Sequence, residues 1–229
     1  QSLVSHISPQ TKTPIATLKM LTDTLRTRPM SEAERAQFLD ASARQIDKLD
    51  FLIQALVKTS RLETGVITLE KRPQPLAETI ALAASGVFAA MEQKELQFSV
   101  SSPETLTLPH DRRWTAEALA NLLDNAVKYT PAGGNVQLDV VCYPMFCALR
   151  VRDDGPGIPE SEQAKIFARF YRAPNAYDKP GVGIGLYLAR QIAQGQGGYI
   201  KCTSAPGKGS TFALYLPAAA LSGKENESC

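Results

Sequence analysis

Residues 1–65 carry the periodicity of two long amphipathic helices. Apolar residues recur every three or four positions within residues 3–25 and again within residues 38–56, which is typical of helices with one apolar stripe. Pro29 separates the two because proline cannot continue a helix, and Gly65 is a natural stop. The pattern predicts a helical hairpin whose stripe is buried when two hairpins form a dimeric four-helix bundle. The alternative is a hairpin that packs on the rest of its own chain.

Shorter helical and strand patterns are intermixed beyond residue 66. The strand patterns cover residues 66–69, 97–100, 105–108, 136–142, 147–152, 199–203 and 211–216. The helical patterns cover residues 76–93, 111–127, 160–170 and 186–194, with Asp111 as an expected N-cap. Short strands that pair locally among helices favour an α/β sandwich with a mixed sheet over a doubly wound fold.

The expected fold class is therefore α+β, a helical hairpin followed by an α/β sandwich. The predicted hairpin ends at residue 65, and residues 66–76 form a linker with a first strand. The α/β domain is expected over residues 77–218. The polar residues 219–229 are expected to be a disordered tail.

Composition and charge narrow the classes of partner. The 229 residues are 44% hydrophobic and carry a formal net charge of +2, which argues against a nucleic-acid partner. No apolar run is long enough to predict a membrane span. Cys142 and Cys147 lie in an apolar region and are predicted to be reduced core residues rather than a disulfide. Cys229, at the terminus, is expected to be exposed.

The first candidate for chemistry is the run from Asp153 through Gly155 and Gly157 to Ile158, directly after an apolar strand pattern. Glycines after a strand allow a tight turn and let a flat ligand approach the backbone. A carboxylate at that turn can accept a hydrogen bond from an exocyclic amine such as that of adenine. Taken alone, the run also fits an ordinary acidic turn.

Two further stretches could hold phosphate and a metal ion. Asn121 and Asn125 are four residues apart, so they share one face of a helix, and their amide oxygens suit Mg²⁺. Lys128 lies three residues beyond Asn125, close enough to meet a phosphate there. The glycines of residues 181–185 leave backbone N–H groups accessible to phosphate just before a helical pattern. A polar helix face and a flexible loop are the alternatives, and the βαβ context of a dinucleotide fingerprint is missing.

Four stretches, taken in chain order, resemble the nucleotide-binding boxes of sensor histidine kinases: residues 117–130, 153–158, 181–186 and 207–212. These kinases belong to the wider ATPase group that includes gyrase, Hsp90 and MutL. Residues 167–172 resemble the phenylalanine motif that begins the family's ATP lid. The resemblance covers nearly the whole chain and implies a Bergerat-type domain with ATP and Mg²⁺ as cofactors. The positions implied to bind them are Asn121, Asn125, Lys128, Tyr129, Asp153, Gly155, Gly157, Ile158, Phe167, Phe170, Arg172, Gly181, Gly183, Gly185, Leu186 and Thr211. Adenine is expected on Asp153, and Mg²⁺ on Asn125 with help from Asn121.

Residues 8–15 resemble the family's phosphoacceptor box, a Ser-His-acid-Leu-basic-Thr-Pro run. Aligning the Lys-Thr-Pro part places Pro9 at the phosphoacceptor and Gln10 at the acidic position, while Thr13 matches the family's water-positioning residue. Proline has no nucleophilic nitrogen, so the resemblance implies that autophosphorylation is blocked in this chain. Using His6 as the acceptor would need three extra residues inside a helix. The sequence leaves open whether Pro9 is natural or a substitution.

Two local expectations follow from the prolines and the second histidine. Pro9 and Pro14 lie five residues apart and are expected to bend or locally unwind the first helix. His110 directly precedes the expected N-cap at Asp111 and is predicted to be a surface or cap-flanking residue.

The leading interpretation is the catalytic portion of a sensor histidine kinase, a homodimer that passes phosphate from ATP to a histidine and on to a response regulator receiver domain. Such kinases usually carry a sensor and membrane helices upstream. The chain is therefore expected to be the cytoplasmic part of a membrane receptor. The alternatives are an ATP-binding pseudokinase scaffold, which Pro9 supports, and a gyrase- or Hsp90-like ATPase. Asn121 argues against the ATPase, because it stands where those relatives carry a water-activating glutamate.

Overall fold

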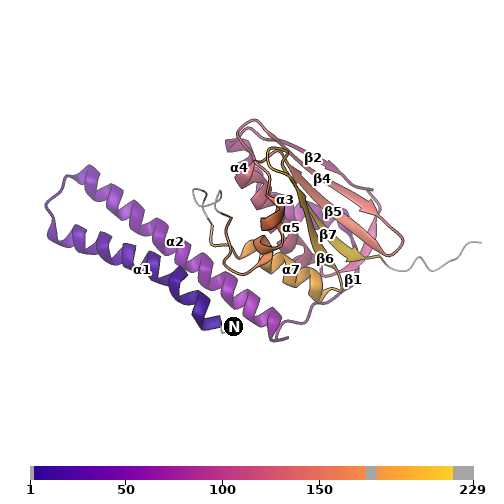
Figure 1. The fold of residues 1–229 in the computed structure, drawn as a ribbon, viewed down its shortest axis with the longest axis horizontal. Helices are drawn as coiled ribbons and strands as arrows, with labels where there is room; N and C mark the ends of the chain where they lie inside the picture. Colours follow the sequence, from indigo (N-terminus) through magenta and orange to yellow (C-terminus); the bar gives the residue numbers. More distant parts are fainter. Residues whose placement is uncertain (1–2, 174–178, 180, 219–229) are drawn as a thin grey trace, which may run out of the picture.

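The computed structural model describes the backbone of residues 3–173, 179 and 181–218, and side chains from residue 11 onward. Two long helices, α1 (Leu3–Thr27) and α2 (Glu32–Glu63), form the expected hairpin, which extends away from the other elements (Figure 1). Ser31 caps α2: its Oγ accepts from the Glu34 backbone N–H, and the Glu34 carboxylate accepts from the Ser31 N–H at 2.8 Å. Both ends of the capping box therefore satisfy amides that the helix leaves without partners.

Helix α1 stays helical through positions 9 and 14, so the predicted local unwinding is wrong, while the predicted bend stays untested. Each proline removes one backbone hydrogen bond, and the bonds on either side still hold the segment. The expected tail at residues 219–229, with Cys229, lies outside the described residues.

A five-stranded mixed sheet forms the centre of the second unit, as predicted. Its strands are β2 (Gln97–Ser101), β4 (Asn135–Cys142), β5 (Phe146–Asp153), β6 (Tyr199–Ser204) and β7 (Ser210–Pro217), in the order β2-β4-β5-β7-β6. The β2–β4 pair is parallel and the other pairs are antiparallel. Strands β1 (Arg72–Pro75) and β3 (Thr107–His110) form a separate antiparallel pair.

Helices cover one face of this sheet (Figure 1). They are α3 (Leu76–Ser85), α5 (Arg112–Tyr129) and α7 (Gly185–Gly195), with α4 (Phe88–Gln93) following α3. Leu119, Leu122 and Leu123 of α5 are fully buried, and so are Leu138 and Leu149 of the sheet. Each such side chain contributes about 1.5–3 kcal/mol when it leaves water. The core thus fixes α5 on the sheet, and the polar face of α5 is left to line a cavity.

Three predicted elements differ in the structure from their sequence patterns. Residues 66–69 form no strand, and Val66 is exposed. The helix predicted over residues 76–93 is divided into α3 and α4 at Gly86 and Val87. Residues 160–170 form α6 (Glu160–Gln163) and the 3₁₀ helix η1 (Lys165–Phe167). The helical part ends at Phe167 because Ala168 is extended, with a φ of −77° and a ψ of 147°. Phe170, with a φ of 64°, could not belong to a right-handed helix either.

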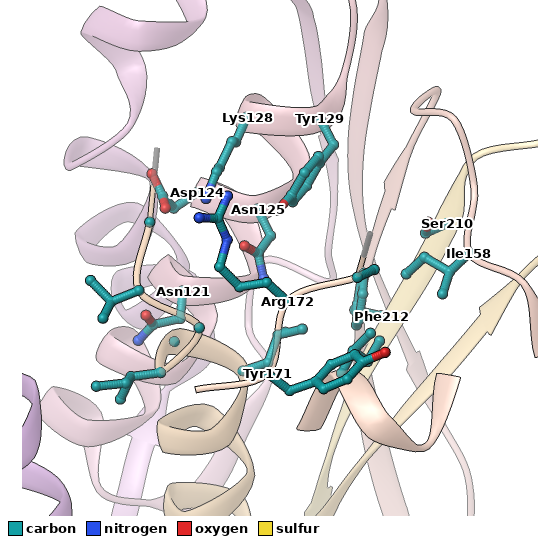
Figure 2. A pocket seen from close by; sticks show the side chains of 18 of the residues that line it. Asn121, Asp124, Asn125, Lys128, Tyr129, Ile158, Tyr171, Arg172, Ser210 and Phe212 are labelled. Carbon is teal, nitrogen blue, oxygen red and sulfur yellow. The ribbon is translucent and has the colours of Figure 1, made fainter. Parts of the chain in front are cut away.

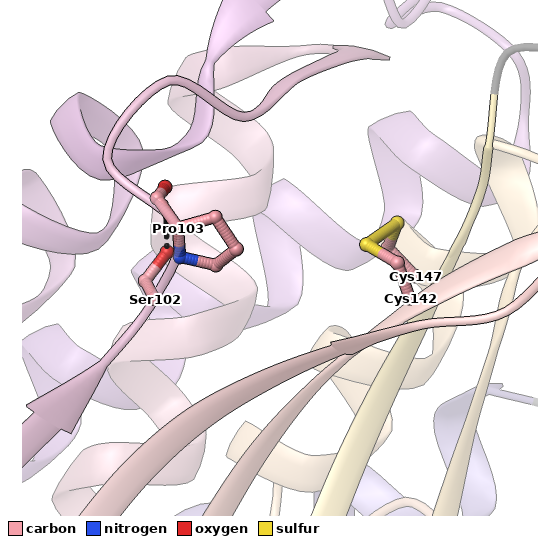
Figure 3. Close-up of a disulfide and its surroundings, with 4 residues drawn as sticks. All are labelled: Ser102, Pro103, Cys142 and Cys147. Carbon is pink, nitrogen blue, oxygen red and sulfur yellow. Dashed lines mark hydrogen bonds between the residues drawn. A yellow bond between two sulfur atoms is a disulfide. The ribbon is translucent and has the colours of Figure 1, made fainter.

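The prediction that Cys142 and Cys147 are reduced is wrong, because the two form a disulfide (Figure 3). The antiparallel register of β4 and β5 places them directly opposite each other, with Cα atoms 4.0 Å apart. Their apolar surroundings suggested core residues, but only the register shows that the two side chains meet.

The prediction that His110 is a surface residue is also wrong, because its side chain is fully buried. Its Nε2 lies 2.7 Å from Thr79 Oγ1, and its Nδ1 lies 2.9 Å from the Leu108 carbonyl oxygen. Burial lowers the pKa of His110, which favours the neutral form of the ring. Its neighbour Asp111 is the N-cap of α5, as predicted, and accepts from the Trp114 N–H at 3.1 Å.

Candidate functional site

A pocket lies between the polar face of α5, the end of β5, the residues before α7 and the start of α7 (Figure 2). It gathers residues that are distant in sequence, because the sheet brings the end of β5 beside the last turns of α5. The predicted site residues that line it are Asn121, Asn125, Lys128, Tyr129, Asp153, Gly157, Ile158, Arg172, Gly181, Gly183, Gly185 and Leu186.

Asp153 ends β5 at one side of the pocket and is 4% exposed. Its Oδ1 accepts hydrogen bonds from the backbone N–H of Gly155 at 2.8 Å and of Ser210 at 3.2 Å. Within the described part of the chain, no donor is found for Oδ2. Burial raises the pKa of Asp153 to about 6 even though these two N–H groups act in the opposite direction. The fixed carboxylate therefore keeps one acceptor oxygen for a ligand's N–H group.

The glycines around Asp153 are needed for close packing of backbone on backbone. Gly157 has a φ of 74°, and a Cβ there would lie 1.9 Å from the Ala205 carbonyl oxygen. At Gly209, with a φ of 72°, a Cβ would lie 1.9 Å from the Asp153 carbonyl oxygen. Gly155 does not line the pocket. These glycines therefore hold two turns together around the carboxylate. Gly157 also lines the pocket, so the approach of a ligand to it stays a prediction.

Helix α5 presents a row of polar side chains to the pocket, since residues three and four apart lie on one face. The Asn121 Nδ2 donates to the Glu117 carbonyl oxygen at 2.9 Å. Its Oδ1 lies beside Gly185, where a Cβ would approach it to 2.7 Å. The Lys128 ammonium likewise lies beside Gly181: a Cβ added at Gly181 would be 2.4 Å from Lys128 Nζ.

Asp124 also lines the pocket, although the sequence reasoning did not include it. Figure 2 shows Lys128 and Arg172 reaching toward the same part of the pocket, beside Asp124. Burial raises the pKa of Asp124, and the charge of Lys128 opposes that rise. Burial lowers the pKa of Lys128, which Asp124 opposes and Arg172 reinforces. The spacing of four between Asp124 and Lys128 was the signal in the sequence that could have revealed this pair.

The residues on either side of the lid are joined at its base. The Phe170 N–H donates to the Gly183 carbonyl oxygen at 2.8 Å, and Arg172 donates to the Lys179 carbonyl oxygen at 2.5 Å. Phe167 and Phe170 are buried and do not line the pocket. Phe167 instead packs edge-on against Phe212, with ring centroids 6.3 Å apart. The phenylalanine motif therefore packs into the core of the domain rather than into the pocket.

Strand alternation explains why Thr211 is absent from the pocket while its neighbours Ser210 and Phe212 line it. Successive side chains of β7 point to opposite faces of the sheet, so the motif marked the correct strand but the wrong face. Other lining residues that the sequence reasoning missed are Phe51, Pro156, Ile166, Tyr171, Ala173, Val182 and Ile184.

The chain is similar to known proteins of one family. Residues 110–220 match the model of the histidine kinase-, DNA gyrase B- and HSP90-like ATPases, a domain that binds ATP. The adaptive-response sensory kinase SasA of Synechococcus sp. (strain JA-3-3Ab) is 31% identical over 218 residues, covering 93% of this chain and 58% of SasA. The chain belongs to the sensor histidine kinases. It spans just over half the length of this relative.

Solved structures share the fold of this histidine kinase along its length. The kinase ThkA in complex with the response regulator protein TrrA matches with a TM-score of 0.79 and 18% identity, covering 96% of this chain and 62% of that one. The Acinetobacter baumannii kinase AdeS matches with a TM-score of 0.71 and 20% identity, covering 90% and 96%. At these identities the likeness shows the fold alone: a helical hairpin followed by an ATP-binding α/β domain.

The hairpin of the kinase contacts the ATP-binding domain at polar pairs beside the pocket. Lys58 of α2 donates to Glu117 of α5 at 2.7 Å. The Glu63 carboxylate at the end of α2 accepts hydrogen bonds from Arg169 and from the Tyr187 hydroxyl. The hairpin therefore contacts α5 through Lys58, and through Glu63 it contacts Arg169 and Tyr187 on the other side of the pocket.

The described part of the phosphoacceptor box, residues 11–15, does not line the pocket. Thr13 is exposed on α1 and does not line the pocket. The side chains of His6, Pro9 and Gln10 lie outside the described residues, so the structure assigns them no contact.

The described residues show neither a cluster of metal ligands nor a membrane-spanning helix. They contain no group of three or more His, Cys, Asp or Glu side chains placed to hold a metal ion. None of the helices in the described ranges is long and apolar enough to cross a bilayer.

Proposed function

We propose that this chain is the catalytic portion of a sensor histidine kinase, which binds ATP with Mg²⁺ along α5 and cannot phosphorylate its own position 9. The observation that carries the proposal is the placement of a buried carboxylate, paired amides and two cations around one pocket. Asp153 would accept the adenine amine on its Oδ2, while Gly155 and Ser210 fix its Oδ1. An acceptor held in this way recognises an exocyclic amine without reorganising.

The opposite side of the pocket would receive the phosphates. Lys128 and Arg172 supply positive charge there, and the glycines of residues 181–185 leave backbone N–H groups accessible beside the start of α7. The amide oxygens of Asn125 and Asn121 suit a hard cation. Mg²⁺ bound there would neutralise charge on the phosphate oxygens during transfer. The remaining predicted contacts of Tyr129, Ile158 and Leu186 would line the nucleotide.

Phosphoryl transfer asks mainly for positioning and charge neutralisation, so this set of groups is adequate for it. The chain's own residues would bind the nucleotide and orient its phosphates. Asn121 occupies the place of the water-activating glutamate of gyrase-like ATPases, which favours transfer over hydrolysis.

Pro9 is the reason to expect that the unaltered chain does not autophosphorylate. By alignment with the family's phosphoacceptor box it replaces histidine, and it offers no nitrogen for attack on the γ-phosphate. Gln10 could orient an acceptor ring but cannot take its proton, and Thr13 would position water in dephosphorylation. Pro9 also supports the second candidate, a pseudokinase scaffold that holds ATP and docks a response regulator.

The partners and location of the whole protein complete the proposal. ThkA is seen with a response regulator, which supports a receiver domain as the partner of this chain. A second copy would complete a four-helix bundle around the hairpin. As the resemblance to sensor histidine kinases implies, the chain would be the cytoplasmic part of a membrane receptor.

Isothermal calorimetry with ATP and Mg²⁺ tests the proposal at the pocket. The unaltered chain should bind with a Kd in the micromolar range, about −8 kcal/mol. Asp153→Ala should weaken binding by about a hundredfold, because the buried adenine amine loses its acceptor. Asp154→Ala is the matched control: Asp154 is exposed and bonds Asn135, away from the pocket. Equal affinities for the two variants would contradict the assignment of Asp153.

A further inference from the structure

Lys94 makes an unusual set of hydrogen bonds just outside the pocket. It follows α4 directly, and its ammonium donates to the backbone carbonyl oxygens of Val127 at 2.7 Å, Lys128 at 3.0 Å and Thr130 at 3.0 Å. An ammonium has three N–H donors, and here each has an acceptor. The side chain is half-buried, and burial lowers the pKa of Lys94.

These acceptors lie at the C-terminus of α5, where a helix leaves its last carbonyls without partners. The Ala126 carbonyl is served by Thr130, whose N–H donates at 2.9 Å and whose Oγ1 donates at 2.6 Å. The next two carbonyls, of Val127 and Lys128, receive Lys94 instead. A positive charge at this end also interacts favourably with the helix dipole. Lys94 therefore caps the C-terminus of α5 together with Thr130, and does so from a different element.

The contact runs in both directions. The Lys94 carbonyl oxygen accepts from the Gly133 N–H at 3.0 Å, so the turn after α5 is bonded to the same residue that caps the helix. The last turn of α5 and the following turn are consequently held by one residue from a different element.

That last turn carries Lys128 and Tyr129 into the pocket, whereas Lys94 does not line the pocket. We propose that Lys94 is a positioning residue, which holds the backbone of Lys128 so that its ammonium reaches the phosphate side of the nucleotide. The inference rests on the proposed ATP function and adds to it a residue that touches no part of the ligand.

A cap that only stabilised the fold would behave differently from one that acts through Lys128. Loss of a purely structural cap would weaken every ligand of the pocket alike, and its effect would add to that of Lys128→Met. Loss of a positioning contact would weaken ligands with phosphates, leave adenosine nearly unchanged, and have no further effect once Lys128 is gone.

The test measures calorimetric affinities of Mg-ATP and of adenosine for the chain and for Lys94→Met, Lys128→Met and the double variant. Lys94→Met should weaken ATP by about tenfold, the size expected for a lost charge-assisted contact. Adenosine should change by less than about twofold, and the double variant should match Lys128→Met. Lys71→Met, an exposed linker lysine, is the control and should bind like the unaltered chain.

A second variant covers the case in which Lys94→Met does not fold. Lys94→Gln keeps two N–H donors and should give an ATP affinity between those of the unaltered chain and Lys94→Met. Equal weakening of ATP and adenosine, or additive effects in the double variant, would overturn the positioning role alone. Absence of ATP binding by the unaltered chain would overturn the proposed function itself and the inference that rests on it.

Discussion

The hairpin and the ATP-binding domain bury their apolar residues in different ways. The domain has a continuous core in which Leu119, Leu122 and Leu149 are completely buried. Along α2, by contrast, Leu39, Ile46 and Ile53 are 55–57% exposed. These three positions are seven residues apart, so they form one stripe on one face of the helix. We call Leu39, Ile46 and Ile53 the α2 stripe.

The difference separates what each part can do alone. The domain's pocket rests on its own core, so a nucleotide site can form without a partner copy. The α2 stripe is too apolar and too regular to be left in water, which supports burial against a second hairpin. Nucleotide binding should therefore depend on the domain, and transfer on how two hairpins assemble.

The largest expected effect is on assembly. Ile46→Glu places a charge in the middle of the α2 stripe and should raise the dimer dissociation constant by about a hundredfold, because a buried unpaired charge is costly. Light scattering should then give a monomer mass at concentrations where the unaltered chain is expected to be a dimer.

Lys48→Glu is the control for this change, since position 48 is two residues along α2 and points away from the α2 stripe. It should remain dimeric. A monomer mass for the unaltered chain at about ten times a micromolar Kd, where a dimer should be assembled, would contradict the bundle.

In the domain, the strongest effect should come from Gly157→Ala. Gly157 and Gly133 both have a φ of 74°, but a Cβ at Gly133 would meet nothing within 4 Å. Gly133→Ala should cost about 1 kcal/mol of unfolding free energy for the backbone strain alone. Gly157→Ala adds the clash with Ala205 and should cost about 3 kcal/mol. Urea unfolding of both variants measures the difference, and equal costs would show that the turns around Asp153 can separate.

The sequence predicted the helices and most strands of the domain because their cores repeat with clear periods. Asp111 was recognisable as an N-cap, and the spacing of Asn121, Asn125 and Lys128 placed them on one helix face. What the sequence could not show depended on long-range register and on which face a side chain takes. How the strands pair decides three of these features: the opposed cysteines, the burial of His110 and the outward-facing side of Thr211. The α2 stripe also differs from the apolar stripe that the pattern within residues 38–56 predicted.

A smaller effect concerns the stability of the site itself. The pKa of Asp153 is raised by burial to about 6, above its ordinary value, so its ionisation opposes folding. Stability should therefore fall as pH rises from about 4 to about 6, where the unfolded chain is ionised and the folded carboxyl resists ionisation. Asp153→Asn should remove this loss and be more stable at pH 7.5, by about 1–3 kcal/mol.

Asp153→Asn should also bind ATP poorly. Its amide N–H group would face the adenine amine, and two donors cannot form a hydrogen bond with each other. ATP affinity of the unaltered chain should rise with pH through about 6 as Asp153 ionises. Thermal melts and calorimetry at pH 5 and pH 7.5 measure both quantities. An Asp153→Asn variant less stable than the unaltered chain at pH 7.5 would contradict a raised pKa for Asp153.

The smallest expected effect is at the contact between the two regions. Glu63→Gln weakens the bonds to Arg169 and Tyr187 and should change stability by about 1 kcal/mol or less. Hydrogen exchange at residues 181–187 should rise a few-fold, because the base of the lid is freed from α2. Glu70→Gln breaks an exposed pair with Arg72 and should leave that exchange unchanged. Equal exchange in both variants would mean that Glu63 does not restrain the lid.

The most direct measurement follows labelled phosphate from γ-labelled ATP onto the protein. The account predicts that the unaltered chain binds ATP and gains no label, whereas Pro9→His gains acid-labile label on the new histidine. Pro9→Ala, which removes the proline without adding a nucleophile, should stay unlabelled. Label on the unaltered chain, including on His6, or a Pro9→His variant that binds ATP but stays unlabelled, would contradict it.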